Sequence, residues 1–171
     1  MPGMMPASPV QPVMASPWWK QRRVVTFGVI LVAIGGVYGL IYMDVVLRAK
    51  ESYLQAEKYM EWNRQPEKKK EFFDLKFEKD KAALQRLLDK KKISEEEFKQ
   101  RLEALTFDRD YAMGESSLKY AYQWYKDTYE LFSPPESKWV RMARAKTPEA
   151  LALWKEELRA KKIPFDDYMV E

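Results

Sequence analysis

Clusters of acidic side chains are the first candidates for chemistry in this sequence. Asp108 and Asp110, and likewise Asp166 and Asp167, offer carboxylate oxygens of the kind that bind divalent cations. Neither pair has the residue spacing of a calcium-binding loop, so we interpret both as solvent-exposed acidic turns. The three glutamates at 95–97 fall in the predicted first turn of a helix, where helix capping explains them.

Two residue types that active sites commonly use do not occur. The chain has no histidine, which is the usual general base and the commonest metal ligand. It also has no cysteine, which excludes disulfides, thiolate metal sites, covalently attached haem and cysteine nucleophiles. Neither a GxxxxGK[ST] nor a GxGxxG motif occurs. We therefore predict no enzyme, no cofactor and no metal site.

Two lysine runs, residues 68–70 and 90–92, are the candidates for nucleic-acid binding. Both runs are embedded among acidic residues, which is typical of a solvated helix surface. The formal net charge of +4 is concentrated before residue 44, where Lys20, Arg22 and Arg23 occur without any acidic residue. The remaining chain is nearly neutral, so we predict no nucleic-acid partner.

These side chains are positioned around one apolar segment, Val24 to Met43. Its twenty residues carry no charge and match the length of a helix that spans a bilayer core. The full length, and the absence of a small-residue cleavage site after it, favour an uncleaved anchor over a signal peptide. The residues predicted at the two membrane interfaces are Trp18, Trp19, Arg22, Arg23, Tyr38 and Tyr42.

The orientation of this segment is predicted from its basic flank. The Lys and Arg counts near its two ends tie, but the basic residues before it lie directly at the boundary. We therefore predict a cytoplasmic N-terminus, with residues 44–171 in the periplasm or an equivalent compartment.

Four glycines lie inside the apolar segment, at Gly28, Gly35, Gly36 and Gly39. Gly35 and Gly39 form a GxxxG pair, and Gly28 lies near the same helical face. Small residues allow a second membrane helix to approach closely, so we predict membrane packing at this face. The alternative is that glycine is simply common in membrane helices.

The rest of the chain predicts helices and no strand. Residues 1–17 contain five of the ten prolines and predict a flexible tail. A juxtamembrane helix over 44–65 continues from the span and ends before Pro66. A second helix follows to Lys90. Ser94 then starts a third, with Glu97 placed to complete a capping box. Residues 66–133 are thus predicted to form a long antiparallel, coiled-coil-like helical hairpin.

The third helix is predicted to run without a break to Ser133, because no proline occurs in it. Two stripes of apolar residues at spacings of three and four follow it and require two neighbours. One neighbour is the second helix; the other is either the 44–63 helix or a second protein.

Residues 134–171 predict short C-terminal helices, one of which starts at Thr147 and Pro148. Aromatic residues lie beyond the reach of the hairpin partner, and buried aromatics dominate interface energetics. The predicted partner-binding residues are Tyr122, Trp124, Tyr125, Tyr129, Trp139 and Trp154.

The segment 71–132 includes the run ISEEEFKQRLEALTFDRDYAMGESSLKYAYQWYKDTYELF. It resembles the charged, aromatic-rich helical stalks beside the membrane anchors of some bacterial respiratory assemblies that include c-type cytochromes. The chain departs from those cytochromes in having no CxxCH, so the resemblance carries over no haem role. It implies an accessory subunit that stands beside redox proteins.

The sequence therefore predicts an all-α protein with a single transmembrane helix. The leading hypothesis is a non-catalytic accessory subunit of a multi-subunit membrane complex, most plausibly a respiratory or electron-transfer one. Its partners would be integral membrane subunits and extramembrane redox subunits. One alternative is a homo-oligomeric, membrane-anchored coiled-coil tether in which the tyrosine stripe pairs with its own copy. A second is a membrane-bound binding module or regulator that uses the terminal helices.

Overall fold

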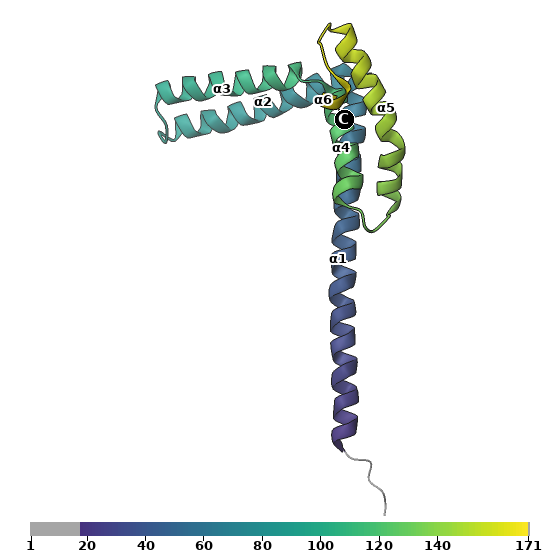
Figure 1. The fold of residues 1–171 in the computed structure, drawn as a ribbon. Coiled ribbons are helices and arrows are strands. Elements are labelled where there is room, and N and C mark those ends of the chain that lie inside the picture. The colour runs from purple at the N-terminus through teal and green to yellow at the C-terminus, as the bar shows by residue number, and fades with distance from the viewer. Residues whose placement is uncertain (1–17, 171) are drawn as a thin grey trace, which may run out of the picture. The chain divides into compact units, whose positions relative to one another are not determined.

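The computed structural model describes residues 18–170, with side chains from residue 22 onward, and it is all-helical over this range. Its elements are α1 (Trp18–Arg64), α2 (Pro66–Asp89), α3 (Glu95–Gly114), α4 (Ser117–Leu131), α5 (Lys138–Ala160) and α6 (Asp167–Val170) (Figure 1). No strand occurs among the described residues, which confirms the predicted all-α class. The predicted tail of residues 1–17 and the side chains of Trp18 and Trp19 lie outside the described part.

The chain divides into two units between Met43 and Asp44. In the first unit, every described side chain from residue 22 to residue 43 is exposed. This stretch is helical and carries an apolar surface on all sides, as a helix does when its surroundings are hydrocarbon.

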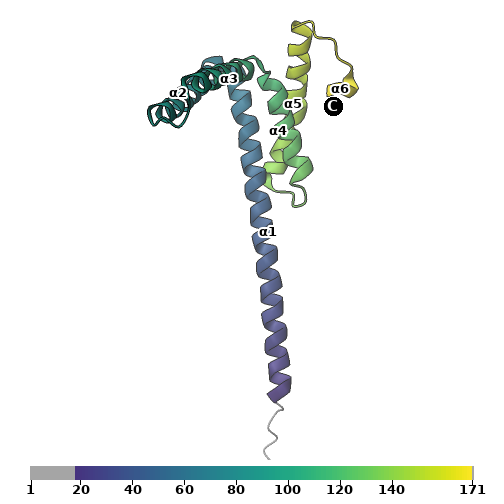
Figure 2. The same ribbon diagram turned by 90° about the vertical axis from the view of Figure 1, so that its left-hand side faces the viewer.

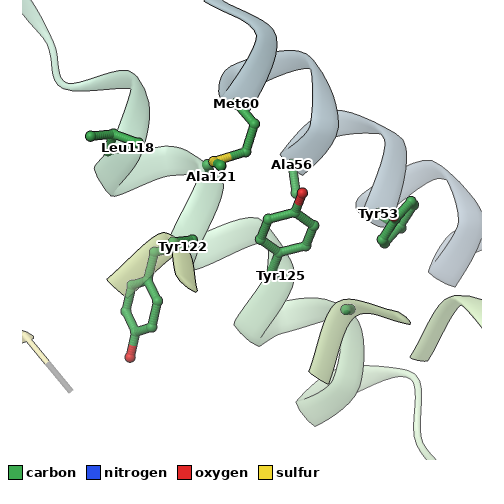
Figure 3. Close-up of a cluster of buried hydrophobic side chains, with 9 residues drawn as sticks. Tyr53, Ala56, Met60, Leu118, Ala121, Tyr122 and Tyr125 are labelled. Atoms are coloured by element: carbon green, nitrogen blue, oxygen red, sulfur yellow. The ribbon is translucent and has the colours of Figure 1, made fainter. Parts of the chain in front are cut away.

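The second unit has its core where residues 44–64 of α1 meet α4 and α5. Four buried residues of α1 recur every three or four positions: Ala49, Tyr53, Ala56 and Met60. Such spacing places them on one helical face. In Figure 3, Tyr125 of α4 extends toward α1, between Ala56 and Tyr53. Buried alanines of α5 complete the cluster, at Ala143 and Ala150.

The helices α2 and α3 lie side by side, as do α4 and α5 (Figures 1 and 2). The helix α1 ends at Arg64, before Pro66, as the sequence predicted, and α2 starts at Pro66, one residue earlier than the predicted Glu67. The Ser94 cap is also confirmed, because Ser94 Oγ accepts a hydrogen bond from Glu97 N at 3.1 Å. The Glu97 carboxylate accepts a hydrogen bond from Arg101 instead of reaching back to close a capping box.

The predicted single helix up to Ser133 is wrong, because the chain leaves the helix between Gly114 and Ser117. Ser116 Oγ caps the new helix α4 by accepting from Lys119 N at 3.1 Å. Lys69 Nζ, on α2, donates to the carbonyl oxygens of Met113 at 3.0 Å and Glu115 at 2.7 Å. Serine side chains compete with helical backbone hydrogen bonds, and this lysine stabilises the carbonyls that the break exposes. The helix that packs beside α2 therefore ends at Gly114, not at residue 133.

The predicted pair of short C-terminal helices is also wrong, because α5 continues through Pro148. Thr147 does not cap a new helix; its hydroxyl donates to the Ala143 carbonyl at 2.8 Å. Proline removes the donor that would bond the carbonyl of Arg144, four residues earlier. Residue 144 is exposed, so water can satisfy that carbonyl. Burial of Ala143, Thr147 and Ala150 holds the two sides of the proline in one helix.

Candidate interaction surfaces

The glycine residues of the apolar segment face open space in this chain. A Cβ atom added at Gly28, Gly35, Gly36 or Gly39 would meet no heavy atom within 4 Å, apart from the helix's own nearby backbone. The chain itself therefore does not need glycine at these positions for packing. The two tyrosines predicted for the far interface, Tyr38 and Tyr42, are exposed, and so are Arg22 and Arg23.

The part of α1 that begins at Arg22 is long and apolar enough to cross a membrane. Among the described residues it is the one helix with that length and composition, and none of its most apolar stretch is buried. Length and composition establish that a span is possible. The orientation of the span stays a prediction.

The aromatic residues predicted to bind a partner gather in the core of the second unit. Tyr125 is completely buried and Tyr122 is 8% exposed. The ring of Tyr125 lies 5.7 Å from that of Tyr53, and the ring of Tyr122 stacks on Trp154 at 5.7 Å. The expectation that Tyr122 and Tyr125 face a partner is therefore corrected, because α1 and α5 already cover them.

The other four predicted partner-binding residues are half-buried. Trp124, Trp139 and Trp154 pack against the core cluster, and the Arg144 guanidinium lies 5.5 Å from the ring of Tyr129. Each of them keeps part of its surface toward solvent. Their role in binding a partner stays a prediction.

A polar network that the sequence did not reveal links three helices of the second unit. The carboxylate of Glu57, on α1, accepts a hydrogen bond from Tyr125 Oη of α4 at 2.6 Å. The same oxygen accepts from Lys146 Nζ of α5. Next to it, Thr128 Oγ1 lies 2.8 Å from Ser52 Oγ, and Ser52 Oγ donates to the Trp124 carbonyl. The signal available in the sequence was weak: Glu57 follows Tyr53 by four residues and so shares its face.

The ionisation of this network follows from its contacts. Burial alone would raise the pKa of Glu57, but hydrogen bonds from Lys146, Tyr125 and Tyr53 outweigh it and lower that pKa. Burial alone would lower the pKa of Lys146, and the hydrogen bond to Glu57 reverses this and raises it. Burial, and then the bond to Glu57, raise the pKa of Tyr125 far above its ordinary range.

These shifts leave the network unsuited to proton transfer. The lowered pKa keeps Glu57 ionised, and its Oε1 already accepts two hydrogen bonds, whereas a general base needs a pKa near the working pH and access to substrate. Lys146 and Tyr125 hold their protons more tightly than usual. The arrangement can cross-link α1, α4 and α5, and it fixes how they pack.

Two of the four aspartates considered for metal binding are engaged in ion pairs. Asp110 pairs with Arg109 at 2.8 Å, and Asp167 pairs with Lys155 at 2.7 Å. Among the described residues, no group of three or more acidic side chains is placed to hold a metal ion.

A shallow groove runs along one face of the α2 and α3 pair. It has an apolar floor with charged residues at its rim. Its lining consists of Phe73, Lys76, Phe77, Asp80, Ala83, Leu84 and Leu87 from α2, and Arg101, Ala104, Leu105, Asp108, Arg109 and Ala112 from α3.

Comparison of the chain with protein-family models, with curated proteins and with solved structures finds no match in any of the three. Functional conclusions therefore rest on the surfaces described above.

Proposed function

We propose that this chain is a single-pass, non-catalytic accessory subunit of a larger membrane assembly. Residues 24–43 would span the bilayer, and residues 44–171 would form a helical protein-interaction domain in water. The observation that carries the proposal is the complete exposure of the apolar stretch 22–43. Exposing that many apolar side chains to water is unfavourable, by about 0.8 kcal/mol per CH₂ group.

Exposure also separates an anchor from the core helix of a soluble protein. A core helix buries its apolar surface against the rest of its own chain, and this stretch buries none. An uncleaved anchor is favoured over a leader by the full spanning length of the segment. The cytoplasmic position of the N-terminus remains part of the proposal and rests on the basic flank.

The open glycine face supports a neighbour inside the membrane. Lipid tails are as apolar as the helix, so helix association in a bilayer depends on close backbone packing, which glycine permits. The glycine positions have space at Cβ and no internal packing role. We infer that another membrane subunit packs there. The respiratory or electron-transfer identity of the assembly rests on the sequence resemblance alone.

The non-catalytic part of the proposal rests on the second unit. Its polar network is built around a carboxylate that hydrogen bonds from Lys146, Tyr125 and Tyr53 hold in the ionised form. The pair formed by α2 and α3 would act as a coiled-coil-like arm, and the half-buried Trp124, Tyr129, Trp139 and Trp154 would contribute to contacts with extramembrane subunits.

Copurification of paired variants tests the proposal. The full chain, tagged and extracted from its native membrane in mild detergent, is compared with Gly35→Leu/Gly39→Leu and with Val37→Leu/Ile41→Leu. The control pair has the same spacing on the opposite helical face. We expect the wild type and the control to copurify with larger membrane subunits and the glycine variant to lose them.

Two results would overturn the proposal. One is recovery of the wild-type chain as a well-behaved monomer without any other subunit. The other is equal copurification of the glycine variant and its control, which would show that the glycine face makes no contact.

A further inference from the structure

The groove between α2 and α3 is an apolar surface that the second unit leaves uncovered. Its floor is formed by large side chains such as Phe77, Leu87 and Leu105, and its middle is lined by two small ones, Ala83 and Ala104. Small residues at the middle of a helix pair let another helix approach closely. Leu87 and Leu105 remain half-exposed because no third helix of the described residues 18–170 covers this side.

In the described residues, two carboxylates at the rim of the groove differ from the neighbouring arginines in having no ion pair. Asp80 on α2 and Asp108 on α3 lie at the same level, and neither forms an ion pair within the described part of the chain. Arg101 lies toward the turn between the two helices, where its guanidinium bonds only its exposed neighbour Glu97. Asp80 and Asp108 thus lie at one level of the rim and Arg101 at another. Two further basic residues, Lys76 and Arg109, lie on the rim farther from the turn.

The spacing of these charges is symmetric about the alanines. Asp108 follows Arg101 by seven residues, which is two helical turns or about 10.5 Å. The midpoint of that interval lies next to Ala104. On α2, the midpoint between Asp80 and Leu87 lies next to Ala83, at the same level of the groove.

We propose that a second copy of this chain occupies the groove and that the two α2–α3 pairs form an antiparallel four-helix bundle. A two-fold axis crosses the pair at the level of Ala83 and Ala104, so that α3 lies against α3 of the second copy and α2 against α2. Such an interface must be self-complementary. The axis places each Arg101 opposite Asp108 of the other copy.

Charge complementarity favours a second copy over other occupants. A purely apolar helix would leave both carboxylates facing hydrocarbon, which is costly. A second copy places Arg101 directly opposite Asp108, Leu87 opposite Asp80 and an alanine at the level of each alanine, so one of the two carboxylates gains a cation opposite it. The proposed dimer involves only α2 and α3. It can therefore be wrong while the proposed membrane role is right, and the membrane role can be wrong while the dimer is right.

Cysteine cross-linking of the full chain in detergent tests the register. The chain has no native cysteine, so single substitutions report on one position each. Ala104→Cys lies beside the axis, whereas Glu103→Cys lies on the opposite face of α3 and is exposed. We expect Ala104→Cys to form disulfide-linked dimers at least tenfold faster than Glu103→Cys. Equal rates, or only monomers at both positions, would overturn the proposal and leave the groove to a different protein.

A charge exchange tests the pairing itself. Arg101→Asp and Asp108→Arg each create like charges across the axis, and the double variant restores opposite charges. We expect each single variant to weaken dimerisation, measured by sedimentation, on the order of tenfold, which corresponds to about 1.4 kcal/mol. The double variant should recover most of the wild-type affinity of the dimer. If the double variant keeps its helix content but does not recover dimerisation, the pairing of Arg101 with Asp108 of the other copy is contradicted.

Two tryptophan variants, one inside the groove and one outside it, distinguish loss of the interface from loss of folding. Ala83→Trp blocks the middle of the groove, and Ala82→Trp adds the same ring one residue away at an exposed position outside it. We expect dimer loss only for Ala83→Trp, with both variants melting at similar temperatures. Dimerisation of the Ala83→Trp variant at the wild-type level would overturn the proposed interface.

Discussion

Two stretches of the same helix, residues 22–43 and 44–64 of α1, relate composition to burial in opposite ways. The first is almost wholly apolar, and all of its described side chains are exposed. The second carries many charges and yet supplies Ala49, Tyr53, Ala56 and Met60 to a protein core. Apolar content alone therefore does not indicate where this protein is packed.

Spacing explains the difference. In 44–64 the apolar residues recur at three and four, so one face can be buried while the charges remain in water. In 24–43 apolar residues occur on every side, so a single protein neighbour could not cover them. The first stretch is long and apolar enough to cross a membrane, and the second packs against a folded surface of its own chain.

The largest effect expected is on the core that 44–64 helps to form. Tyr125→Ala removes a completely buried ring beside Tyr53 and should lower the free energy of unfolding by about 3–5 kcal/mol. Tyr38→Ala, in the exposed stretch, should change it by less than about 0.5 kcal/mol. Denaturant unfolding of the full chain in detergent, monitored by tryptophan fluorescence, measures both changes in the free energy of unfolding. Similar losses for the two variants would break the distinction between the stretches.

The next effect concerns insertion into the membrane. Ile34→Arg places a charge at the middle of the apolar stretch, at a cost of about 2.5–3.5 kcal/mol on insertion scales. Leu54→Arg, at an exposed position of the second stretch, should leave insertion unchanged. Carbonate extraction of membranes measures the inserted fraction of each variant. Unchanged extraction of the Ile34→Arg chain would argue against a spanning segment.

A smaller effect, about 1 kcal/mol, is expected from the Glu57 network. Glu57→Gln keeps the shape but removes the charge that Lys146 and Tyr125 bond. Because folding lowers the pKa of Glu57, its stabilising effect is present above its ordinary value of 4.5 and is lost as pH falls through the folded value. The melting-temperature difference between wild type and variant should thus be constant from about pH 6 to 8 and vanish on acidification. A difference that persists at pH 2 would show that the charge is not its origin.

The smallest effect is expected from the exposed surface of the second stretch. Arg48 pairs with Asp44 at 2.8 Å, and both side chains are more than half exposed. Arg48→Ala should cost about 0.3–0.5 kcal/mol, and less at high salt. Thermal unfolding at low and at high salt checks this. A loss above 1 kcal/mol would mean that charges, and not the buried face, hold this stretch in place.

Helix type was predictable from the sequence, whereas helix continuity was not. The ends of α1 and α2 follow from Pro66 and from the Ser94 cap, which are local signals. The break before α4 depends on Lys69, which lies far away along the chain and bonds the carbonyl of Met113. The proline at 148 is tolerated because packed residues flank it on both sides. In each wrong prediction, tertiary contacts outweighed a local preference.

The candidate surfaces also divide into features that the sequence predicts and features that depend on tertiary contacts. The glycine face could be read from spacing, and the structure leaves it open. The aromatic stripe was also visible, but the sequence could not tell whether the chain itself or a partner would cover it. The structure shows that α1 and α5 cover Tyr122 and Tyr125. The Glu57 network required knowledge of three helices at once.

Site-specific labelling in native membranes tests most directly whether the two stretches of α1 lie in different solvents. Val32→Cys and Glu51→Cys both replace residues that are exposed in the chain itself. With a membrane-impermeant maleimide applied from both sides of opened membranes, we predict rapid labelling at position 51 and none at position 32 until detergent is added. Equal labelling of the two positions before detergent would contradict a membrane-spanning first stretch.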